Sequence, residues 1–415
     1  MAHVAAPDYL GDDFSTAPPG HRFSLYLPYW IRGTWAREPD KAAGKGGLPA
    51  ATGKAPTFAS VVAMGQAFTA LNQKLVERQK AAAALLIEQG AMLTLHARAV
   101  APFTTGLGNE HPLENGFAFL NPYGLPYLPG SGVKGVLRQA ARELIGHHWG
   151  SHQGWTDGAI DALLGKTGDT TDAEGATELQ RGALTFWDVL PQIEGDALQV
   201  EVMTPHQSHY HQNGATPHES GQPNPIHFLT VPPGSKFAFH VHCDLAFLAR
   251  LSPELADDGA WQRLLNAAFV HAFQWLGFGA KTAVGYGAMA EDLDARRASE
   301  LRAAERRAAA QAAAREQALS EMSPQQREQH EAGQALDEFR AALDTARQLK
   351  PYKKGSAFDG LRAEFLRRAM AWTEPSLRAD AARALREAYK FTDWPGNSER
   401  KKEVKLSLTA LDGQP

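Results

Sequence analysis

The chain has 415 residues, 43% of them hydrophobic, which is enough for roughly two to three domains with apolar cores. Its single cysteine, Cys243, excludes an intramolecular disulfide framework and a zinc site built from cysteines. No apolar run reaches the ~18 residues of a membrane span, and the first residues lack a secretory signal, so we expect a cytoplasmic protein that makes no membrane contact.

Charge is distributed unevenly along the chain. Residues 1–90 carry nine basic and seven acidic residues, residues 91–290 carry ten and eighteen, and residues 291–415 carry twenty-three and twenty-one. A generic basic nucleic-acid binder is therefore not indicated. If the ligand is RNA, a few placed cations, backbone amides and partner subunits must hold it.

In chain order, residues 1–58 are irregular apart from an aromatic strip at 23–31. Residues 59–89 predict a helix that ends at Gly90, and residues 93–100 alternate as a half-buried strand does. Ser131 is placed to cap a helix over 131–147. Further strands are expected at 183–189, 198–203, 226–231, 236–243 and 284–289, with a helix over 261–276.

The order of these elements predicts an α+β fold. Strand–helix–strand–strand–helix–strand is the ferredoxin-like or RRM-type pattern, here with long insertions. From about residue 292 the composition changes to Ala, Arg and Glu, which predicts an all-helical appendage over 295–320, 324–349, 357–372 and 375–390. We therefore expect three parts: an N-terminal irregular segment and helix (1–90), a core (91–291) and the appendage (292–415).

The first candidate site is the segment 128–138, where a glycine-rich turn enters a helix. Helix N-termini favour anions, and glycine in a first helical turn costs stability, which suggests that something approaches closely. Lys134, Arg138 and Arg142 are spaced by four and predict one ridge on the helix. This ridge would follow a phosphate backbone; a solvated helix face is the alternative, and we favour it for Arg142.

The second candidate is the loop 276–289, with Gly277, Gly279, Gly285 and Gly287 around Lys281. It is not a nucleotide-binding P-loop, because Ala280 stands where a glycine must precede the lysine and because a helix precedes the loop. A helix-to-strand turn with Gly277 as the cap would explain one of the four glycines and leave the other three unexplained. A phosphate-rich polymer is the better candidate ligand than a bound nucleotide.

The third candidate is a histidine cluster in a loop rich in Gly, Pro and Asn. It comprises His206, His209, His211, His218 and His227. The first three have the chemistry of zinc ligands, but such a loop would hold them poorly and no orienting carboxylate is evident. More often, such loop histidines are polar surface or stack on RNA bases, and we expect His206 to contact RNA. Histidine can also act as a general acid or base in RNA cleavage.

Six segments carry a resemblance that covers about residues 60–290: 104–108, 127–138, 182–188, 202–206, 223–231 and 277–287. Together they resemble the RAMP superfamily of CRISPR-associated proteins, and within it the subunit-six family of the type III-B (Cmr) effector complex. The resemblance implies an RRM-like fold that binds the guide (CRISPR) RNA backbone and caps the filament at the guide's 3′ side, beside other type III-B effector subunits, without cleaving the target. We expect the protein to need no cofactor, no metal and no small-molecule substrate.

Carried over to this sequence, the resemblance places Ser131, Lys134 and Arg138 in the first-helix motif and Lys281 with its four glycines in the glycine loop. The rival hypothesis is a RAMP-type, metal-independent endoribonuclease that processes repeat RNA, with a histidine as base and a lysine to stabilise developing charge. The appendage has no counterpart in the family. Its apolar positions Leu336, Phe339, Leu343 and Leu349 suit a protein partner, and its basic positions are either solvated or meet nucleic acid.

Overall fold

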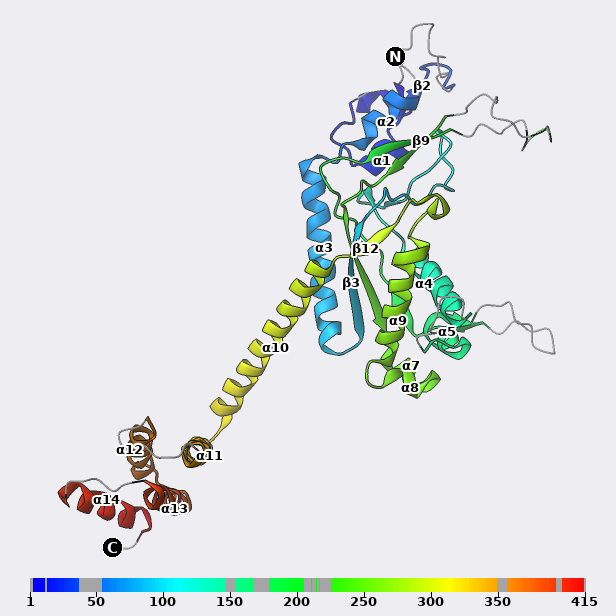
Figure 1. Ribbon diagram of the computed structural model, residues 1–415. Coiled ribbons are helices and arrows are strands. Elements are labelled where there is room, and N and C mark those ends of the chain that lie inside the picture. Colours follow the sequence, from blue (N-terminus) through cyan, green and yellow to red (C-terminus); the bar gives the residue numbers. More distant parts are fainter. Residues whose placement is uncertain are drawn as a thin grey trace. The chain divides into compact units, whose positions relative to one another are not determined.

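The structure is a computed structural model that describes residues 3–11, 13–36, 54–146, 154–166, 179–204, 210, 214, 216, 225–348, 357–392 and 398–413 (Figure 1). The chain divides into two compact units, Met1–Leu301 and Arg302–Pro415. Helix α10 (Leu293–Glu321) begins in the first unit and continues into the second. The sequence predicted three parts, with boundaries at residues 90 and 291, and that division stays a prediction.

A four-stranded antiparallel sheet organises the first unit. Its strand order is β12–β3–β11–β8, and the long central strands β3 and β11 pair so that Leu95 lies opposite Phe239. The alternation read from the sequence predicted both strands correctly, because each has one apolar face. Their bounds are Met92–Ala99 for β3, Leu184–Phe186 for β8, Lys236–Cys243 for β11 and Met289–Glu291 for β12.

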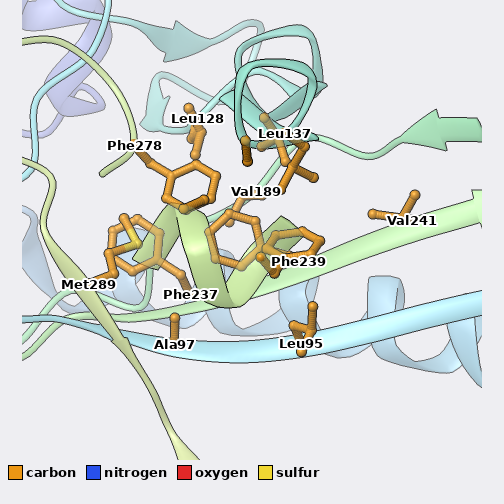
Figure 2. Close-up of a cluster of buried hydrophobic side chains, with 14 of the residues drawn as sticks. Leu95, Ala97, Leu128, Leu137, Val189, Phe237, Phe239, Val241, Phe278 and Met289 are labelled. Atoms are coloured by element: carbon orange, nitrogen blue, oxygen red, sulfur yellow. The ribbon is translucent and has the colours of Figure 1, made fainter. Parts of the chain in front are cut away.

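Two helices build the main core on one face of this sheet. Helix α4 (Gly130–Ile145) follows β3 in the chain, and helix α9 (Ala260–His271) follows β11. They are tied together by His271, whose Nε2 lies 2.7 Å from Oε2 of Glu143. Figure 2 shows the cluster between helices and sheet, where Phe237 and Phe239 of β11 meet Leu137 of α4 and Phe278.

Helix α3 (Gly65–Glu88) lies on the other side of β3 (Figure 1). Its anchors are mainly polar: Asn72 Nδ2 donates to the Pro191 carbonyl at 2.8 Å, and Gln79 Nε2 donates to the Asp188 carbonyl at 2.9 Å. This face of the sheet is correspondingly polar and includes His240, whose Nδ1 lies 2.9 Å from Thr94 Oγ1. The two sheet faces thus differ in chemistry as well as in their covering helices.

A separate hairpin stands beside the glycine loop. Strands β9 (Gln199–Met203) and β10 (Ile226–Thr230) pair antiparallel, with Val202 opposite His227. The remaining short strands also pair in twos: β1 (His3–Val4) with β2 (Pro28–Trp30), β4 (Phe119–Leu120) with β5 (Leu125–Pro126), and β6 (Gly165–Lys166) with β7 (Gln180–Arg181).

The aromatic strip 23–31 packs on the body of its own unit. Phe23, Leu27 and Tyr29 are buried in the main core, whereas Leu25 and Ile31 are exposed. The other helices of the first unit are η1 (Asp8–Leu10), α1 (Pro19–Ser24), α2 (Lys54–Val62), α5 (Asp157–Leu164), α7 (Leu245–Leu251), α8 (Pro253–Ala256), the π-turn η2 (Ala272–Leu276) and the short η3 (Thr282–Val284).

The second unit is helical and has its own core. Phe339 of α11 stacks on Phe365 of α12 with ring centroids 4.2 Å apart. The positions Leu336, Phe339 and Leu343, predicted to await a partner, are buried inside this core, so that expectation was wrong. Leu349 lies outside the described residues. The helices are α11 (Pro324–Gln348), α12 (Ala357–Met370), α13 (Pro375–Phe391) and α14 (Ser398–Leu411).

Four sequence-based expectations need correction. The predicted helix 59–89 is two helices, since Gly65 adopts a φ of 69° and Ala63 bridges to Ala197. The strand expected at 284–289 starts too early: the 3-10 helix η3 ends at Val284, residues 285–287 form a turn, and β12 begins only at Met289. Helices α1, α5, α7, α8 and α14 were not predicted, because each is short or lacks a wide apolar stripe. Residues 1–58, expected to be irregular, also contain β1, β2 and the start of α2.

Candidate nucleic-acid interface

The first site begins where α4 starts, one residue earlier than predicted. The residue that caps the helix is Pro129, and Ser131 makes no capping bond; it is an exposed residue in the first turn. The free N–H of Gly130 instead donates to Asp188 Oδ1 at 2.8 Å. A carboxylate of the protein therefore already occupies the position where the helix N-terminus would favour an anion.

The glycines of this segment fall into two classes. A Cβ on Gly130 would lie 2.1 Å from the Phe186 carbonyl oxygen, so close packing requires glycine there. Gly132 and Gly135 differ: a Cβ at 132 would meet only Leu128 Cδ1 at 3.4 Å, and one at 135 would meet nothing within 4 Å. Both are exposed residues inside a helix, where glycine is unfavourable. The fold does not require these two glycines.

Lys134 lies between Gly132 and Gly135 and is half-buried. Burial lowers the pKa of its ammonium group, and the nearby Arg138 guanidinium lowers it further. Within the described chain no carboxylate lies within ion-pairing distance of Lys134. An anion beside this turn would meet a cation that the protein itself leaves uncompensated.

Arg138 has a role in the fold, and its phosphate contact stays a prediction. Its Nη2 donates to the carbonyls of Leu164 at 2.6 Å and Gly165 at 2.8 Å, at the end of α5. A guanidinium placed there satisfies carbonyls that the helix end leaves without partners. The predicted ridge of three basic residues is thereby reduced, since its middle member is directed to α5 and Arg142 is simply exposed.

The glycine loop is explained largely by its own backbone. Gly277 caps the preceding π-turn with a φ of 68°. A Cβ on Gly279 would lie 2.2 Å from the Thr104 carbonyl oxygen, and one on Gly287 would lie 1.8 Å from the Phe278 carbonyl oxygen. Only Gly285 has open space around it, and its φ of 94° still favours glycine. Close packing thus explains two of the three glycines that a cap alone leaves unexplained, and the RNA contact of this loop stays a prediction.

Hydrogen bonds fix this loop to the turn after β3. Ala280 N–H donates to the Thr104 carbonyl at 2.8 Å, and Gly287 N–H donates to the Pro102 carbonyl at 2.8 Å. Phe278 is fully buried and lies in the same cluster as Leu128, which precedes α4 (Figure 2). The two motifs that are far apart in sequence are thus anchored in one core.

The close packing that explains the glycines does not explain why a lysine stands at position 281 of this loop. It adopts the left-handed conformation, with a φ of 59°, which is uncommon for a residue with a side chain. Its Nζ lies 3.4 Å from Met203 Sδ and 5.2 Å from the centre of the Phe228 ring. Among the described residues no carboxylate pairs with it. The ammonium group is held against two weak partners on the β9–β10 hairpin.

Tyr286 completes the contact between loop and hairpin. Its ring packs edge-on against Phe228, with centroids 5.4 Å apart, and its hydroxyl lies 3.5 Å from Glu201 Oε2. Burial raises the pKa of the Tyr286 hydroxyl, and the Glu201 carboxylate raises it further. Glu201 is therefore engaged with Tyr286, and among the described residues no carboxylate pairs with Lys281.

The histidine cluster is only partly within the described chain. His206, His209, His211 and His218 lie outside the described residues. His227 lies on β10, where its ring stacks near Phe58 at a centroid distance of 6.1 Å. Where the chain is described, no group of three or more His, Cys, Asp or Glu side chains could hold a metal ion.

Two residues of the site were not predicted from the sequence. Asp188, at the end of the segment 182–188, anchors the start of α4, and Thr104 positions the glycine loop through its carbonyl. A carboxylate that caps a helix 58 residues earlier in the chain leaves no local spacing signal.

No helix of the described chain is both long and apolar enough to cross a membrane.

Comparison with known proteins identifies a related family. Residues 96–290 match the RAMP superfamily. The CRISPR system Cmr subunit Cmr6 of Pyrococcus furiosus is 28% identical over 233 residues, which cover 45% of this chain and 64% of that protein, less than two thirds of its length.

Two solved structures are also similar. One is the cryo-EM structure of the type III-B Cmr-beta complex bound to cognate target RNA, with a TM-score of 0.40, 18% identity and coverage of 55% of this chain and 68% of that chain. The other is the crystal structure of Cmr6 from Pyrococcus furiosus, with a TM-score of 0.25, 23% identity and coverage of 48% and 97%. Residues 96–290 thus match the RAMP superfamily, and over 45% of its length the chain is similar to Cmr6.

Proposed function

We propose that this chain is a non-catalytic, RNA-binding structural subunit of a type III-B CRISPR effector complex, acting in the cytoplasm and capping the backbone near the 3′ end of the guide RNA. The observation that carries the proposal is the exposed turn at the start of α4, where Gly132 and Gly135 flank Lys134 and the fold itself requires neither glycine. The similarity to Cmr6 supports the assignment to such a complex.

The RNA backbone would run along the exposed face of this turn. The N–H of Gly130 is taken by Asp188, so a phosphate is expected beside Gly132, Lys134 and Gly135, away from the helix terminus. Lys281 would supply a second cation from the glycine loop. Because phosphate contacts position a strand without reading its bases, guide binding should be independent of guide sequence.

The finer description of the fold belongs to the same proposal. A four-stranded antiparallel sheet with one helix after its first strand and one after its third fits a ferredoxin-like or RRM-type core. The hairpin β9–β10 and helix α5 would then be insertions. In this arrangement both cationic motifs lie in the connections that follow β3 and β11.

Other effector subunits are the proposed protein partners. Several large apolar side chains of the N-terminal segment are exposed, notably Tyr9 at 85%, Leu25 at 58% and Trp35 at 49%. Neighbouring subunits that cover them would remove this apolar area from water and stabilise the assembly. This part of the proposal predicts assembly that does not depend on the lysines at the RNA site.

The experiment measures guide RNA binding by the full chain as a function of salt. Lys134→Ala and Lys281→Ala should each weaken binding equally for guides of unrelated sequence and lower the salt slope by about 0.7 for each phosphate that is no longer neutralised. Lys74→Ala, which removes an exposed lysine of α3, is the matched control and should change neither quantity. Unaltered binding in the Lys134→Ala, Lys281→Ala double variant would refute the assignment.

The same preparations test the endoribonuclease alternative. Incubation with repeat RNA in the presence of a chelator should leave the RNA intact if the subunit is structural. Cleavage that disappears in a His206→Ala variant would replace the proposal with the ribonuclease.

A further inference from the structure

The β9–β10 hairpin presents one face to the glycine loop. In the antiparallel register Glu201 lies opposite Phe228. Residues opposite each other share a face of the pair, as do residues two apart on one strand, so Glu201, Met203 and Phe228 lie on the same face. The glycine loop meets this face through Lys281, which contacts Met203 Sδ and the Phe228 ring, and through Tyr286, which contacts the Phe228 ring and Glu201 Oε2.

This contact face carries one cation and one carboxylate that do not pair with each other. Lys281 Nζ and the Tyr286 ring lie 5.2 Å and 5.4 Å from the centre of the Phe228 ring, whereas Glu201 contacts the tyrosine hydroxyl. Within the described residues no basic side chain lies within ion-pairing distance of Glu201. Lys281 and Glu201 are both half-buried, so each presents part of its side chain to solvent. A ligand that reaches this face therefore meets an ammonium group and a carboxylate as separate groups.

The carboxylate of Glu201 can accept further hydrogen bonds. Its Oε2 lies 3.5 Å from the Tyr286 hydroxyl, which is longer than the roughly 2.5–3.0 Å of ordinary O–H···O hydrogen bonds. An ionised carboxylate has about four lone-pair sites and donates no hydrogen bond, and among the described residues no other group donates to this one. The ligand group that Glu201 recognises must therefore be a hydrogen-bond donor.

A lysine and a carboxylate on one face discriminate between the two kinds of nucleic acid. A phosphodiester is anionic and has no donor, so Lys281 attracts it and Glu201 repels it. The 2′-hydroxyl of ribose is a donor of the RNA backbone, and its presence is what distinguishes RNA from DNA. A ribonucleotide can satisfy both side chains, with its phosphate on Lys281 and its 2′-hydroxyl on Glu201. A deoxyribonucleotide leaves Glu201 with repulsion alone.

We propose that Glu201 is a specificity-determining residue that accepts a hydrogen bond from a ribose 2′-hydroxyl of the strand bound by Lys281. Tyr286 is a positioning residue, because its hydroxyl contacts the Glu201 carboxylate and its ring holds the loop on the hairpin. The inference rests on the proposed RNA-binding function and adds the chemical group that is recognised. Because every ribonucleotide carries this hydroxyl, the selection of RNA over DNA is independent of base sequence.

Binding of the full chain to single strands tests this proposal. Two RNAs of unrelated sequence and the DNAs of the same sequences are compared in the wild type and in Glu201→Ala. Loss of the carboxylate removes an acceptor that only RNA uses and a negative charge that repels both strands. DNA affinity should therefore rise, and the ratio of RNA affinity to DNA affinity should fall about tenfold for both sequences, as expected for a hydrogen bond to a charged group. Glu77→Ala, which removes an exposed glutamate of α3, is the matched control and should leave the ratio unchanged.

Two further measurements do not depend on the stability of Glu201→Ala. Tyr286→Phe keeps the ring against Phe228 and removes the hydroxyl that contacts Glu201, so the ratio should fall in the same direction by a smaller factor. Uniformly 2′-fluoro RNA has a small substituent in place of the hydroxyl and no donor there. The wild type should bind it about as weakly as DNA, although its sugars resemble those of RNA.

Several outcomes would overturn the proposal. Equal changes of RNA and DNA affinity in Glu201→Ala would show that the carboxylate only repels phosphate or only supports the loop. Wild-type binding of 2′-fluoro RNA as tight as that of RNA would show that no 2′-hydroxyl is recognised, and a fall of the ratio for one sequence alone would indicate a base contact. These results leave the RNA-binding function intact. Absence of RNA binding, or RNA binding that Lys281→Ala does not weaken, refutes the lysine assignment itself, and the inference falls with it.

Discussion

Gly135→Ala separates the structural and functional roles of the α4 turn in a single variant. The new methyl group would meet no atom within 4 Å, and an exposed helical glycine is about 0.5–1 kcal/mol less favourable than alanine. We therefore expect α4 to become more stable by about that amount. The same methyl group would stand between the helix backbone and a phosphate that lies against it, so RNA binding should weaken while stability rises.

Both effects are measurable in the full chain. Hydrogen exchange of α4 amides should slow about two- to fivefold, which corresponds to the stated free energy at about 1.4 kcal/mol per tenfold. Guide RNA affinity should fall about tenfold, since a phosphate moved away from the turn weakens its charge-assisted contact with Lys134, and such a contact contributes about 1.5–3 kcal/mol. Gly360→Ala in α12, another helical glycine with open space around it, is the matched control and should slow exchange locally without a change in RNA affinity. Slower exchange together with unchanged RNA affinity in Gly135→Ala would show that nothing approaches this turn.

Two further predictions concern the fold around the site. Burial, and then the charges of His96 and Lys80, lower the pKa of His240 to about 4. The unfolded state therefore binds the proton more tightly than the folded state. The free energy of unfolding should be complete above pH 6.5 and fall as the pH drops toward 4, by about 2 kcal/mol at pH 5. Urea denaturation at pH 7.5 and 5 should show a smaller loss for His240→Gln, and an equal loss in both proteins would contradict this origin. Gly279→Ala would force a Cβ to 2.2 Å from the Thr104 carbonyl oxygen at a φ of 92°. It should lower the free energy of unfolding by more than Gly285→Ala, where only the left-handed conformation, about 1–3 kcal/mol, opposes the change. Equal urea midpoints for the two variants would contradict the close contact.

Regular alternation and helical spacing made much of the fold predictable. Strand β11 begins and ends where the apolar alternation of 236–243 does, and helix α4 follows its apolar stripe to within two residues. In the appendage, Pro324 and Pro375 each start a helix where the sequence indicated a break. Each of these signals lies within one short segment, so a single sequence is enough to detect it.

Contacts between distant segments explain what the sequence did not predict. Glycine density at 277–287 indicated a ligand, but Gly279 and Gly287 are required by carbonyls of Thr104 and Phe278. Arg138 was expected on a phosphate; its contact with the end of α5, a helix that lacked a predictive stripe, was not predicted. A sequence shows that a backbone must come close to something, and only the folded chain shows what that neighbour is.

The acidic character of residues 91–290 does not argue against an RNA site, because placement outweighs net charge at short range. Several basic residues of the first unit are neutralised locally: Arg98 by Asp292, Arg181 by Asp244 and Arg263 by Asp258. Lys134 and Lys281, in contrast, have no carboxylate within ion-pairing distance in the part of the chain that the structure describes. At physiological salt the Debye length is about 8 Å, so a phosphate bound beside either lysine would respond mainly to that ammonium group and little to distant acidic residues. A lower salt slope in Lys134→Ala and Lys281→Ala, with an unchanged slope in Lys74→Ala, is the consequence that a uniformly acidic surface would not produce.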